Sequence, residues 1–584
     1  MMGLLLIGIV AILLIWIMSH LRIFIRNYNA ARATGLPIII CPYDPDSVVF
    51  TFISEPLRPL LKPILPASIF AVFDATCWGW EFHDKGAAHE KFGDAFIMVT
   101  TGHNRLVCAD PAMSQSVLAR RKDFHHPELS KKTMGVLGPN LVTSRDESWS
   151  RQRRIIAPTF NERISLDVWK EGVQQASALV DHVLSSSTLS QSMTLSTSPA
   201  ADKSSDSLPG LRAIAINVLT RVAYGRHTPF SIASSYRDAT KALTYVDGIA
   251  LVVDLLLVAA FIPAGILRLP FMPQLSKKLG QAMVKLPDLT VDMLDQERKR
   301  ISSADSKEFQ NTIMTTLVRL SDQGREQDDD QGSSGKSVAT GGNKQYLTEE
   351  EIAGNLFIFT AAGFDTTSNT MSYAICLLAA YPEWQAWIQA EIDVVLGAGD
   401  HEQISLEDYT AIFPKLTRCL AVMFETLRVY PAVSLLIRTV ETNQTIFPSS
   451  SKSDSFILQA PCAVHVNIMA LHTSRSTWGA DTLDFKPARW FPEGQDSMYV
   501  PPRGTFMPWS SGPRNCPGQK MSQVEFVSVV MTLFGKCSVE PVAEKGQTVK
   551  QARERLLGLL QDSQPVLTLQ INKPREVKLK WTRR

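Results

Sequence analysis

One cysteine stands in a segment whose neighbours favour a thiolate. Residues 509–518 read Trp-Ser-Ser-Gly-Pro-Arg-Asn-Cys-Pro-Gly, and a helical pattern follows. Cys516 therefore precedes a predicted helix N-terminus, where the helix dipole and backbone N–H groups favour the ionised sulfur. Gly512 and Gly518 lack a Cβ and let the backbone pass close to a flat cofactor. Arg514, two residues before the sulfur, can reach an anionic group on that cofactor's rim.

A second segment joins an acid and a hydroxyl in the middle of a long helical pattern. It reads Ala-Gly-Phe-Asp-Thr-Thr over residues 362–367. Gly363 loosens a helix, and Thr366 can bond back to a carbonyl one turn earlier, so the segment is locally unfavourable. Such a cost is tolerated more readily at a functional site, where Asp365 and Thr366 can handle protons. Small residues packed against a neighbouring helix are the alternative interpretation.

In two further pairs of residues, a charged side chain and a possible partner project from the same face of a predicted helix. Trp149 and Arg153 are four residues apart, so an indole N–H and a guanidinium project from the same face. Glu425 and Arg428 are three residues apart on an apolar helical pattern, where they can pair. Both spacings also occur on ordinary exposed helices, so the pairs gain weight only from the other segments.

The order of these segments resembles that of the cytochrome P450 family. The family's haem loop usually reads Phe-x-x-Gly-x-Arg-x-Cys-x-Gly, and Trp509 replaces the phenylalanine here. The Ala-Gly-x-Asp/Glu-Thr motif is present without departure. In the family, residues matching Glu425, Arg428 and Arg489 form a buried charge network that braces the proximal side. Many members carry histidine where this chain has Gln152, which leaves one propionate contact open.

The resemblance implies a cofactor and a role for each matching residue. The cofactor is haem b, iron protoporphyrin IX, with the Cys516 thiolate as the iron ligand, a combination that favours O–O bond cleavage. Asp365 and Thr366 would be catalytic, relaying protons and hydrogen-bonding oxygen. Arg438 would reach a propionate from a strand. The implied cofactor-binding residues are Cys516, Arg514, Trp149, Arg153, Arg438, Trp509, Gly512 and Gly518.

The N-terminus has the composition of a membrane anchor. Residues 1–18 contain no charged side chain and, as a helix, span roughly 27 Å, close to the thickness of a bilayer core. Basic residues follow at Arg22, Arg26 and Arg32, whereas a signal peptide carries them before its apolar run. The positive-inside rule then predicts a single-pass protein of the endoplasmic reticulum membrane with a cytosolic catalytic domain. A cleaved secretory signal is the alternative.

The remaining chain predicts a mostly α-helical fold with small β-sheets. Long helical patterns cover 347–380, 383–396 and 415–430, and short extended pieces cover 96–100, 105–109 and 463–468. Under the resemblance this is the cytochrome P450 fold, with haem between the long oxygen-activation helix and the cysteine loop.

The sequence also predicts how the chain is divided. We expect an anchor over residues 1–25, a Pro-rich hinge over 26–66 in which regular helix cannot run far, and a catalytic domain over 67–584. Polar inserts near 185–207 and 321–345 indicate solvated loops. The apolar stretch 249–273, interrupted by two prolines, indicates either core or contact with the membrane.

Composition and length limit the partners. The formal net charge is +2, and the dispersed Lys and Arg residues give no indication of a nucleic acid partner. Eight cysteines without a CxxC pair fit a reducing compartment. Cys516 lies 68 residues before the end of the 584-residue chain, and no dinucleotide fingerprint appears. Electrons are therefore expected from a separate NADPH-dependent flavoprotein reductase.

The sequence thus predicts a membrane-anchored haem-thiolate monooxygenase that inserts one oxygen atom from O₂ into a lipophilic small molecule. The flanking sequence looks most like fungal members, many of which act in secondary-metabolite pathways. One alternative is a reductase-independent enzyme that rearranges an oxidised substrate, against which the retained Asp365 and Thr366 argue. A non-catalytic haem sensor protein is another. Substrate contacts are expected in the ranges 101–138, 249–273, 357–364 and 433–437.

Overall fold

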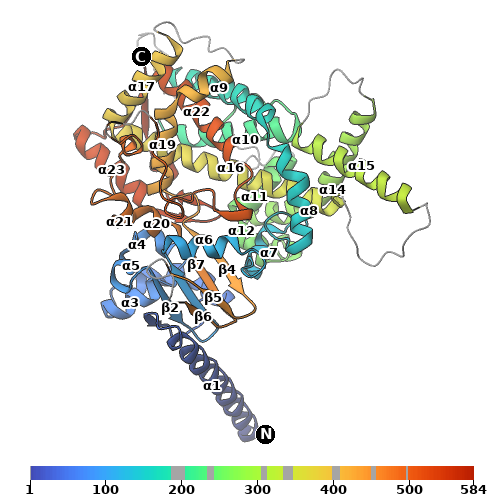
Figure 1. The fold of residues 1–584 in the computed structure, drawn as a ribbon, viewed down its shortest axis with the longest axis vertical. Helices are drawn as coiled ribbons and strands as arrows, with labels where there is room; N and C mark the ends of the chain where they lie inside the picture. The colour runs from blue at the N-terminus through green and yellow to red at the C-terminus, as the bar shows by residue number, and fades with distance from the viewer. Residues whose placement is uncertain are drawn as a thin grey trace. The chain divides into compact units, whose positions relative to one another are not determined.

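The computed structural model describes most of the chain. The described residues are 2–185, 204–232, 243–303, 312–332, 346–397, 408–448, 455–492, 494 and 497–584. Helices predominate, with four small sheets among these residues (Figure 1). The predicted mostly helical fold with small β-sheets is therefore confirmed.

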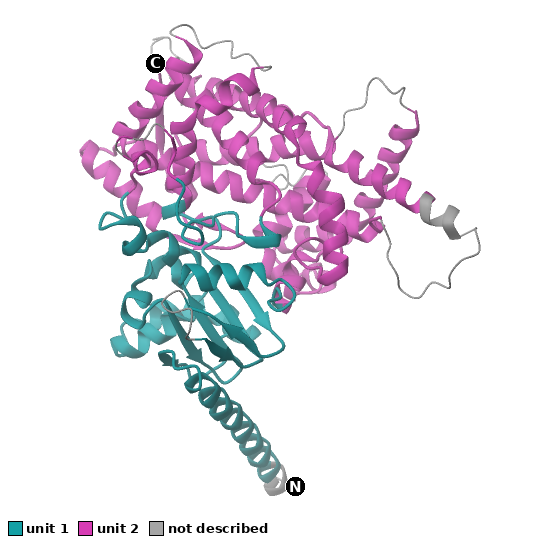
Figure 2. Cartoon of the chain, viewed as in Figure 1, with its two compact units in different colours: residues 1–127, 428–484, 500–515 teal, residues 128–427, 485–499, 516–584 magenta. Residues whose placement is uncertain are grey.

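The chain forms two compact units, each assembled from separate stretches (Figure 2). Unit 1 comprises residues 1–127, 428–484 and 500–515, and unit 2 comprises residues 128–427, 485–499 and 516–584. The predicted anchor and hinge both lie in unit 1. The predicted division into anchor, hinge and catalytic domain is a functional one and stays a prediction.

Unit 1 is built around a five-stranded sheet with the strand order β1-β2-β3-β7-β4. Strands β2, β3 and β7 are buried along their whole length, because they lie inside the sheet and both faces are covered. They coincide with the predicted extended pieces. The strands of unit 1 are β1 (Ile38–Ile40), β2 (Ala95–Val99), β3 (Asn104–Cys108), β4 (Leu435–Val440), β5 (Gln444–Ile446), β6 (Phe456–Leu458) and β7 (Cys462–Asn467).

Helix α1 has an exposed apolar part and a docked end. Its residues 6–32 are long and apolar enough to cross a membrane. Asn27 is buried, and its Nδ2 donates to the carbonyls of Thr100 and Gly102, each at 3.0 Å. Asn104 Nδ2 in turn donates to the Asn27 carbonyl at 2.8 Å. The last turns of α1 are therefore fixed to the turn between β2 and β3.

The expectation that regular helix cannot run far within 26–66 was wrong. Helix α2 covers Val48–Leu61 and contains Pro56 and Pro59. Both prolines are exposed, so water can solvate the carbonyls that lose their N–H partners. The helices of unit 1 are α1 (Met2–Arg32), α2, α3 (Ala67–Asp74), α4 (Trp80–Asp84), α5 (Ala87–Phe92), α6 (Pro111–Ala119), α20 (Ile468–Thr473) and α21 (Arg475–Trp478).

Unit 2 is a helical assembly in which α9 packs on α10 and α22, and α10 packs on α16. Glycines permit the close approaches. A Cβ at Gly172 of α9 would lie 2.2 Å from Ser528 Oγ of α22, and one at Gly210 of α10 would lie 2.6 Å from Leu179 Cδ1 of α9. The three long helices predicted from periodicity are present as α16, α17 and α19.

The remaining elements belong to unit 2, except that the last two residues of α19 lie in unit 1. Its helices are α7 (Glu128–Met134), α8 (Asp146–Ile156), α9 (Glu162–Leu184), α10 (Ser207–Tyr224), α11 (Tyr245–Asp254), α12 (Leu256–Phe261), α13 (Ala264–Leu267), α14 (Gln274–Ser303), α15 (Ile313–Gly332), α16 (Glu349–Ala380), α17 (Pro382–Leu396), α18 (Tyr409–Ile412), α19 (Thr417–Val429), α22 (Gln519–Lys536) and α23 (Val549–Gln561). Its strands are β8 (Cys537–Pro541), β9 (Ser563–Pro565), β10 (Leu569–Ile571) and β11 (Leu579–Arg583).

The structure tests part of what the sequence predicts for the two polar inserts and for the apolar stretch 249–273. Residues 321–332 continue α15, so the predicted loop was wrong there, because Gln323, Arg325 and Glu326 favour the continuation of a helix that has already begun. The rest of that insert, from 333 to 345, and residues 186–203 of the first insert lie outside the described residues. The stretch 249–273 is split: residues 249–253 are buried in α11, whereas Ile266 and Phe271 are exposed, the latter by 79%.

Candidate functional site

Cys516 lies at the end of a loop, two residues before the Gly518 cap of α22. Burial raises the pKa of the Cys516 thiol. A hydrogen bond from the Gly518 backbone N–H and the positive charge of Arg153 both act to lower that pKa. These two groups stabilise the ionised sulfur, so Cys516 is placed to serve as an anionic ligand.

Space is open beside the Cys516 sulfur. Apart from chain neighbours, a Cβ added at Gly518 would meet only one described atom within 4 Å, the sulfur itself at 3.9 Å. Gly518 thus leaves room for a planar group at the sulfur, as the predicted haem requires. Gly512 is glycine for another reason. Its φ is +71°, and a Cβ there would lie 2.7 Å from the Leu118 carbonyl oxygen of α6.

Helix α8 brings Arg153 toward Cys516 within unit 2. Burial lowers the pKa of the Arg153 guanidinium, and the Cys516 sulfur acts to raise it. Trp149 is buried one turn earlier on α8, on the same face as Arg153. Gln152 is also fully buried, but its side chain binds residues of α16. The helix therefore presents a cation near the sulfur and an amide to α16.

Asp365 and Thr366 lie on α16, and their side chains have different partners. Thr366 Oγ1 donates to the Ala362 carbonyl at 2.7 Å, the back-bond expected from the sequence. Asp365 is 2% exposed, and it accepts a 2.7 Å hydrogen bond from Thr568 Oγ1. Arg212 Nη1 of α10 lies 4.0 Å from its Oδ1. Burial raises the pKa of Asp365, while Arg212 and Thr568 act to lower it.

Gly363, the glycine expected to loosen the helix, faces a neighbouring helix. A Cβ at this position would lie 3.2 Å from Leu219 Cδ1 and 3.4 Å from Leu219 Cδ2 of α10. The missing side chain is therefore accounted for by the close packing of α10 on α16. This corresponds to the alternative interpretation of small residues packed against a neighbouring helix.

Two cations of unit 1, the buried Arg438 and the half-buried Arg514, lie near enough to repel each other. Arg438, on β4, is 4% exposed, and its guanidinium donates to the Ile437 carbonyl at 2.9 Å. No carboxylate pairs with it within the described ranges. Burial lowers the pKa of Arg438 to about 10, and the positive charge of Arg514 contributes to this effect. Two cations kept together without a counter-charge for Arg438 fit an anionic ligand such as a haem propionate.

The predicted charge network is divided between the units. In unit 2, Glu425 is fully buried and accepts hydrogen bonds from Lys486 N at 2.9 Å, Arg489 Nε at 3.3 Å and Trp490 Nε1 at 3.2 Å. In unit 1, Arg428 donates to the carbonyls of His472 and Asp484, each at 3.0 Å.

Trp509, a predicted cofactor-binding residue, is half-buried and lies just before the cysteine loop.

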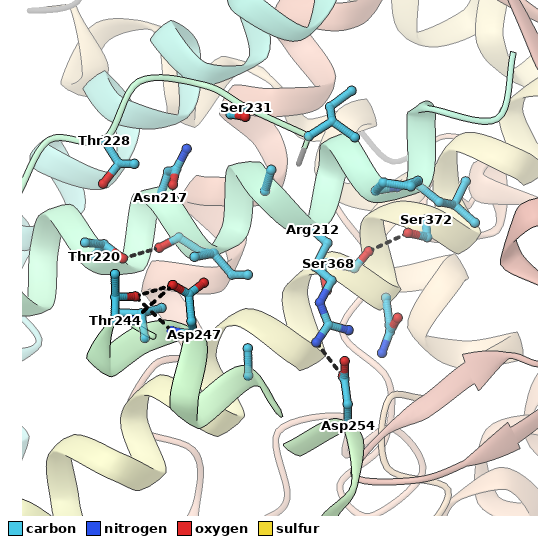
Figure 3. A pocket seen from close by; sticks show the side chains of 18 of the residues that line it. Arg212, Asn217, Thr220, Thr228, Ser231, Thr244, Asp247, Asp254, Ser368 and Ser372 are labelled. Atoms are coloured by element: carbon cyan, nitrogen blue, oxygen red, sulfur yellow. Dashed lines mark hydrogen bonds and ion pairs between the residues drawn. The ribbon is translucent and has the colours of Figure 1, made fainter. Parts of the chain in front are cut away.

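A cavity of about 870 Å³ opens in unit 2 beside α10, α11 and α16 (Figure 3). Its lining includes Arg212, which pairs with Asp254 at 2.5 Å, and Ser368 and Ser372 of α16. Of the four ranges expected to contact substrate, only 249–273 contributes to it. The cavity therefore includes part of one predicted range, and it reaches Arg212, the cation beside Asp365.

Sequence reasoning missed the residues that hold Asp365. Thr568 is 203 positions away along the chain, and Arg212 lies on a different helix. Asn369 Nδ2 donates to Thr568 Oγ1 at 2.9 Å, which holds that hydroxyl in place. No local spacing connects these side chains, so no motif could have identified them.

Comparisons with known proteins identify a family for this chain. Residues 79–569 match the cytochrome P450 family. The chain is 29% identical to the phomenoic acid biosynthesis cluster cytochrome P450 monooxygenase of Leptosphaeria maculans, with 95% of each chain covered. It is 27% identical to cytochrome P450 monooxygenase ORF6 of Penicillium roqueforti, over 93% of this chain and 92% of that one.

A solved structure shows the same fold. The crystal structure of a cytochrome P450, CYP102L1, superposes with a TM-score of 0.62 at 17% identity, covering 86% of this chain and 98% of that one. The family match and the full-length relatives together show that the chain belongs to the cytochrome P450 family of monooxygenases.

Proposed function

We propose that the protein binds haem b through Cys516 and inserts one oxygen atom from O₂ into a lipophilic small molecule. The setting of the Cys516 sulfur carries this proposal: two groups favour the thiolate, and space is open beside it. Haem held by the Cys516 thiolate would supply the activation of O₂. The reaction consumes one O₂, two electrons and two protons, and yields the oxidised product and one water.

Four side chains are proposed to hold the haem propionates. Arg438 and Arg514 supply positive charge in unit 1, where Arg438 lacks a carboxylate partner among the described residues. Arg153 and Trp149 present a guanidinium and an indole from one face of α8. Charge-assisted hydrogen bonds to a carboxylate would offset the cost of keeping the Arg438 cation buried.

Asp365 is proposed to pass protons toward Thr366, its neighbour on α16. Its raised pKa allows a buried carboxyl to take up and release a proton nearer to neutral pH. Arg212 connects it to the cavity beside α10, where water can supply protons. Thr568 holds the carboxyl in one orientation.

The protein is proposed to be anchored in the endoplasmic reticulum membrane through α1, with electrons from an NADPH-dependent flavoprotein reductase. Residues 6–32 have the length and composition of a spanning helix, and the exposed Ile266 and Phe271 offer a further apolar contact. The name of the Leptosphaeria relative places that protein in a biosynthetic cluster. We infer a role in fungal secondary metabolism for this chain as well.

The optical spectrum of the dithionite-reduced, carbon-monoxide-bound protein tests the proposal. We expect a strongly red-shifted Soret band in the wild type and its loss in Cys516→Ser, because serine does not supply a thiolate. Cys376→Ser is the matched control, since Cys376 is buried inside α16 and should leave the band unchanged. A wild-type protein that holds haem without the red shift would contradict thiolate ligation.

A further inference from the structure

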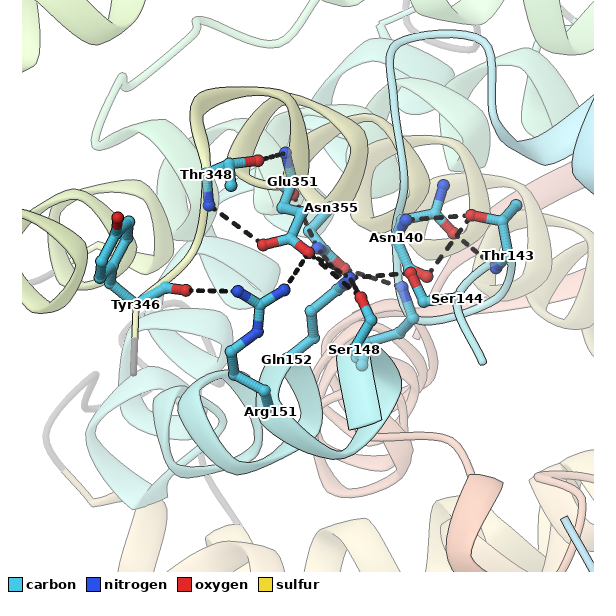
Figure 4. A network of polar contacts seen from close by, with 11 residues as sticks. Asn140, Thr143, Ser144, Ser148, Arg151, Gln152, Tyr346, Thr348, Glu351 and Asn355 are labelled. Atoms are coloured by element: carbon cyan, nitrogen blue, oxygen red, sulfur yellow. Dashed lines mark hydrogen bonds and ion pairs between the residues drawn. The ribbon is translucent and has the colours of Figure 1, made fainter. Parts of the chain in front are cut away.

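The amide of Gln152 joins α8 to the first turns of α16 (Figure 4). Gln152 Nε2 donates to Ser144 Oγ at 2.7 Å, Glu351 Oε1 at 3.1 Å and Ser148 Oγ at 3.2 Å. Its Oε1 accepts from Asn355 Nδ2 at 2.9 Å. The side chain is fully buried. The amide therefore contacts two residues of α16 and two that precede or begin α8.

These contacts leave the amide with no free donor. A glutamine amide has two N–H groups, and three acceptors already surround the Gln152 nitrogen. The orientation is chemically determined, because a carboxylate faces the nitrogen and the Asn355 amide faces the oxygen. A propionate needs a donor, and a carbonyl oxygen cannot provide one. Gln152 therefore has no N–H group to offer a haem carboxylate.

The α16 side of the contact is itself fixed. Glu351 is buried, pairs with Arg151 of α8, and accepts from Thr348 N at 3.0 Å in the capping box of α16. Asn355 Oδ1 accepts from Leu141 N at 3.0 Å, on the loop before α8. The clamp formed by Gln152, Glu351 and Asn355 thus ties α8 and that loop to one end of α16.

The backbones also meet closely at this point. A Cβ at Gly354 of α16 would lie 2.4 Å from the Pro139 carbonyl oxygen, and one at Gly138 would lie 2.3 Å from the Glu350 carbonyl oxygen. Such approaches leave little freedom for the loop to move away from α16. Displacing the Gln152 amide would therefore be felt along α8, including at the next residue, Arg153.

We propose that Gln152 is a positioning residue that clamps α8 onto α16 and thereby fixes Arg153, and that it does not bind the haem itself. The inference rests on the proposed function, because Arg153 is the side chain through which it acts. Histidine at this position would lose contacts, because a neutral imidazole has one donor and one acceptor for at least four partners. The clamp and a direct propionate contact predict different behaviour for variants of Asn355.

The experiment measures the rate of haem release to excess apomyoglobin for wild type, Gln152→Ala, Asn355→Ala and the double variant. We expect each single variant to release haem roughly 10-fold faster, as loss of an outer-shell partner does at other metal sites. The double variant should release haem clearly less than roughly 100-fold faster, because both changes remove the shared Gln152–Asn355 hydrogen bond and their effects cannot add in full. Urea unfolding of the four apo-proteins measures the interaction energy between the Gln152 and Asn355 changes in the absence of haem.

A rescue and a matched control complete the design. Gln152→Glu places two carboxylates together and should speed haem release, and adding Glu351→Gln restores a donor facing an acceptor and should return the rate toward wild type. Gln385→Ala is the control: Gln385 is also buried and donates to the carbonyls of Leu378 and Val539. It should lower stability and leave the haem-release rate unchanged.

The outcomes separate the clamp from the proposed function. Faster release in Gln152→Ala with no change in Asn355→Ala would show a direct haem contact and overturn the clamp. Variants that release haem at the wild-type rate would overturn it as well. A wild-type protein that takes up no haem would overturn the proposed function, and with it the role of Gln152 toward Arg153.

Discussion

Thr568 Oγ1 donates a hydrogen bond of 2.7 Å to Asp365 Oδ2 across 203 positions of sequence. The carboxyl is buried in α16, and burial raises its pKa despite this hydrogen bond and the nearby Arg212. A raised carboxyl pKa means that the folded protein binds a proton more readily than the unfolded chain. Asp365 therefore lowers the stability of the folded state when it is ionised, as expected of a group kept for chemistry.

Asp365→Asn should stabilise the protein and reduce its activity. The stability of the wild type falls as pH rises from the ordinary aspartate pKa of about 3.9 to the raised pKa of Asp365. Above both pKa values the folded protein carries the full energetic cost of the buried, ionised carboxylate. We expect the variant to have a larger free energy of unfolding at neutral pH, with the difference shrinking on acidification. Turnover should fall by roughly 100-fold because the proton donor is lost. Urea unfolding across pH measures the stability, and the rate of product formation measures the turnover.

Thr568→Val serves as the comparison for that variant. Removing a donor that favours the ionised form raises the pKa of Asp365 further. Because a proton donor acts in its protonated form, the alkaline limb of the pH–rate profile should move to higher pH, while the carboxyl remains present and most activity is retained. An unchanged profile in Thr568→Val would exclude Asp365 as the group that titrates.

Arg438→Met should change the stability of the apo-protein and haem retention in opposite directions. The pKa of Arg438 is lowered to about 10, which at neutral pH corresponds to a cost on the order of 3 kcal/mol in the folded state. Methionine removes that cost, so the apo-protein should resist urea better. Haem affinity should fall by roughly 10- to 100-fold because a charged hydrogen bond is lost. A variant that retains haem as tightly as wild type would contradict a propionate contact.

Glu425→Ala should prevent haem incorporation more than it slows chemistry. The fully buried carboxylate accepts from Lys486 N, Arg489 Nε and Trp490 Nε1, so its removal leaves three donors without their acceptor. We expect a loss of about 3–5 kcal/mol in the free energy of unfolding. The haem-to-protein ratio after purification measures the consequence, and full haem occupancy would refute the prediction.

Glu391 of α17 provides a control for Glu425, because it caps the start of α19, the helix that carries Glu425. Its carboxylate accepts from the α19 backbone N–H groups of Arg418 at 2.7 Å and Cys419 at 3.1 Å. Glu391→Ala removes this cap at a cost of about 1 kcal/mol. It should leave the haem-to-protein ratio near that of wild type.

Two truncations test how α1 is joined to unit 1. A chain that begins at residue 23 keeps Asn27 and its contacts to Thr100, Gly102 and Asn104, whereas one that begins at residue 33 loses them. Both should leave the membrane fraction if α1 is the anchor. Only the shorter chain should lose stability, by roughly 1–3 kcal/mol, because buried polar groups lose their partners. Equal melting temperatures for the two chains would contradict the docking of α1.

Local patterns in the sequence were enough for the helices and for the motifs. The periodicity of 347–380 predicts α16, and a cysteine before a helix start predicts the loop ahead of α22, because both signals come from residues near each other in the chain. The prediction that regular helix cannot run far within 26–66 was wrong because Pro56 and Pro59 face water, which the local sequence does not show. The expected loop at 321–332 failed because composition alone does not reveal that a helix has already begun.

The chemistry proposed for this protein rests on residues within a few positions of each other: Cys516 with Arg514 and Gly518, and Asp365 with Thr366. Their partners come from folding. Thr568 and Arg212 contact the Asp365 carboxyl from distant parts of the chain. Glu351 and Asn355 form hydrogen bonds with the Gln152 amide. Leu219 packs against Gly363. Side-chain spacing along a helix carries information over about one turn, whereas burial and hydrogen bonding depend on which segments pack together in three dimensions.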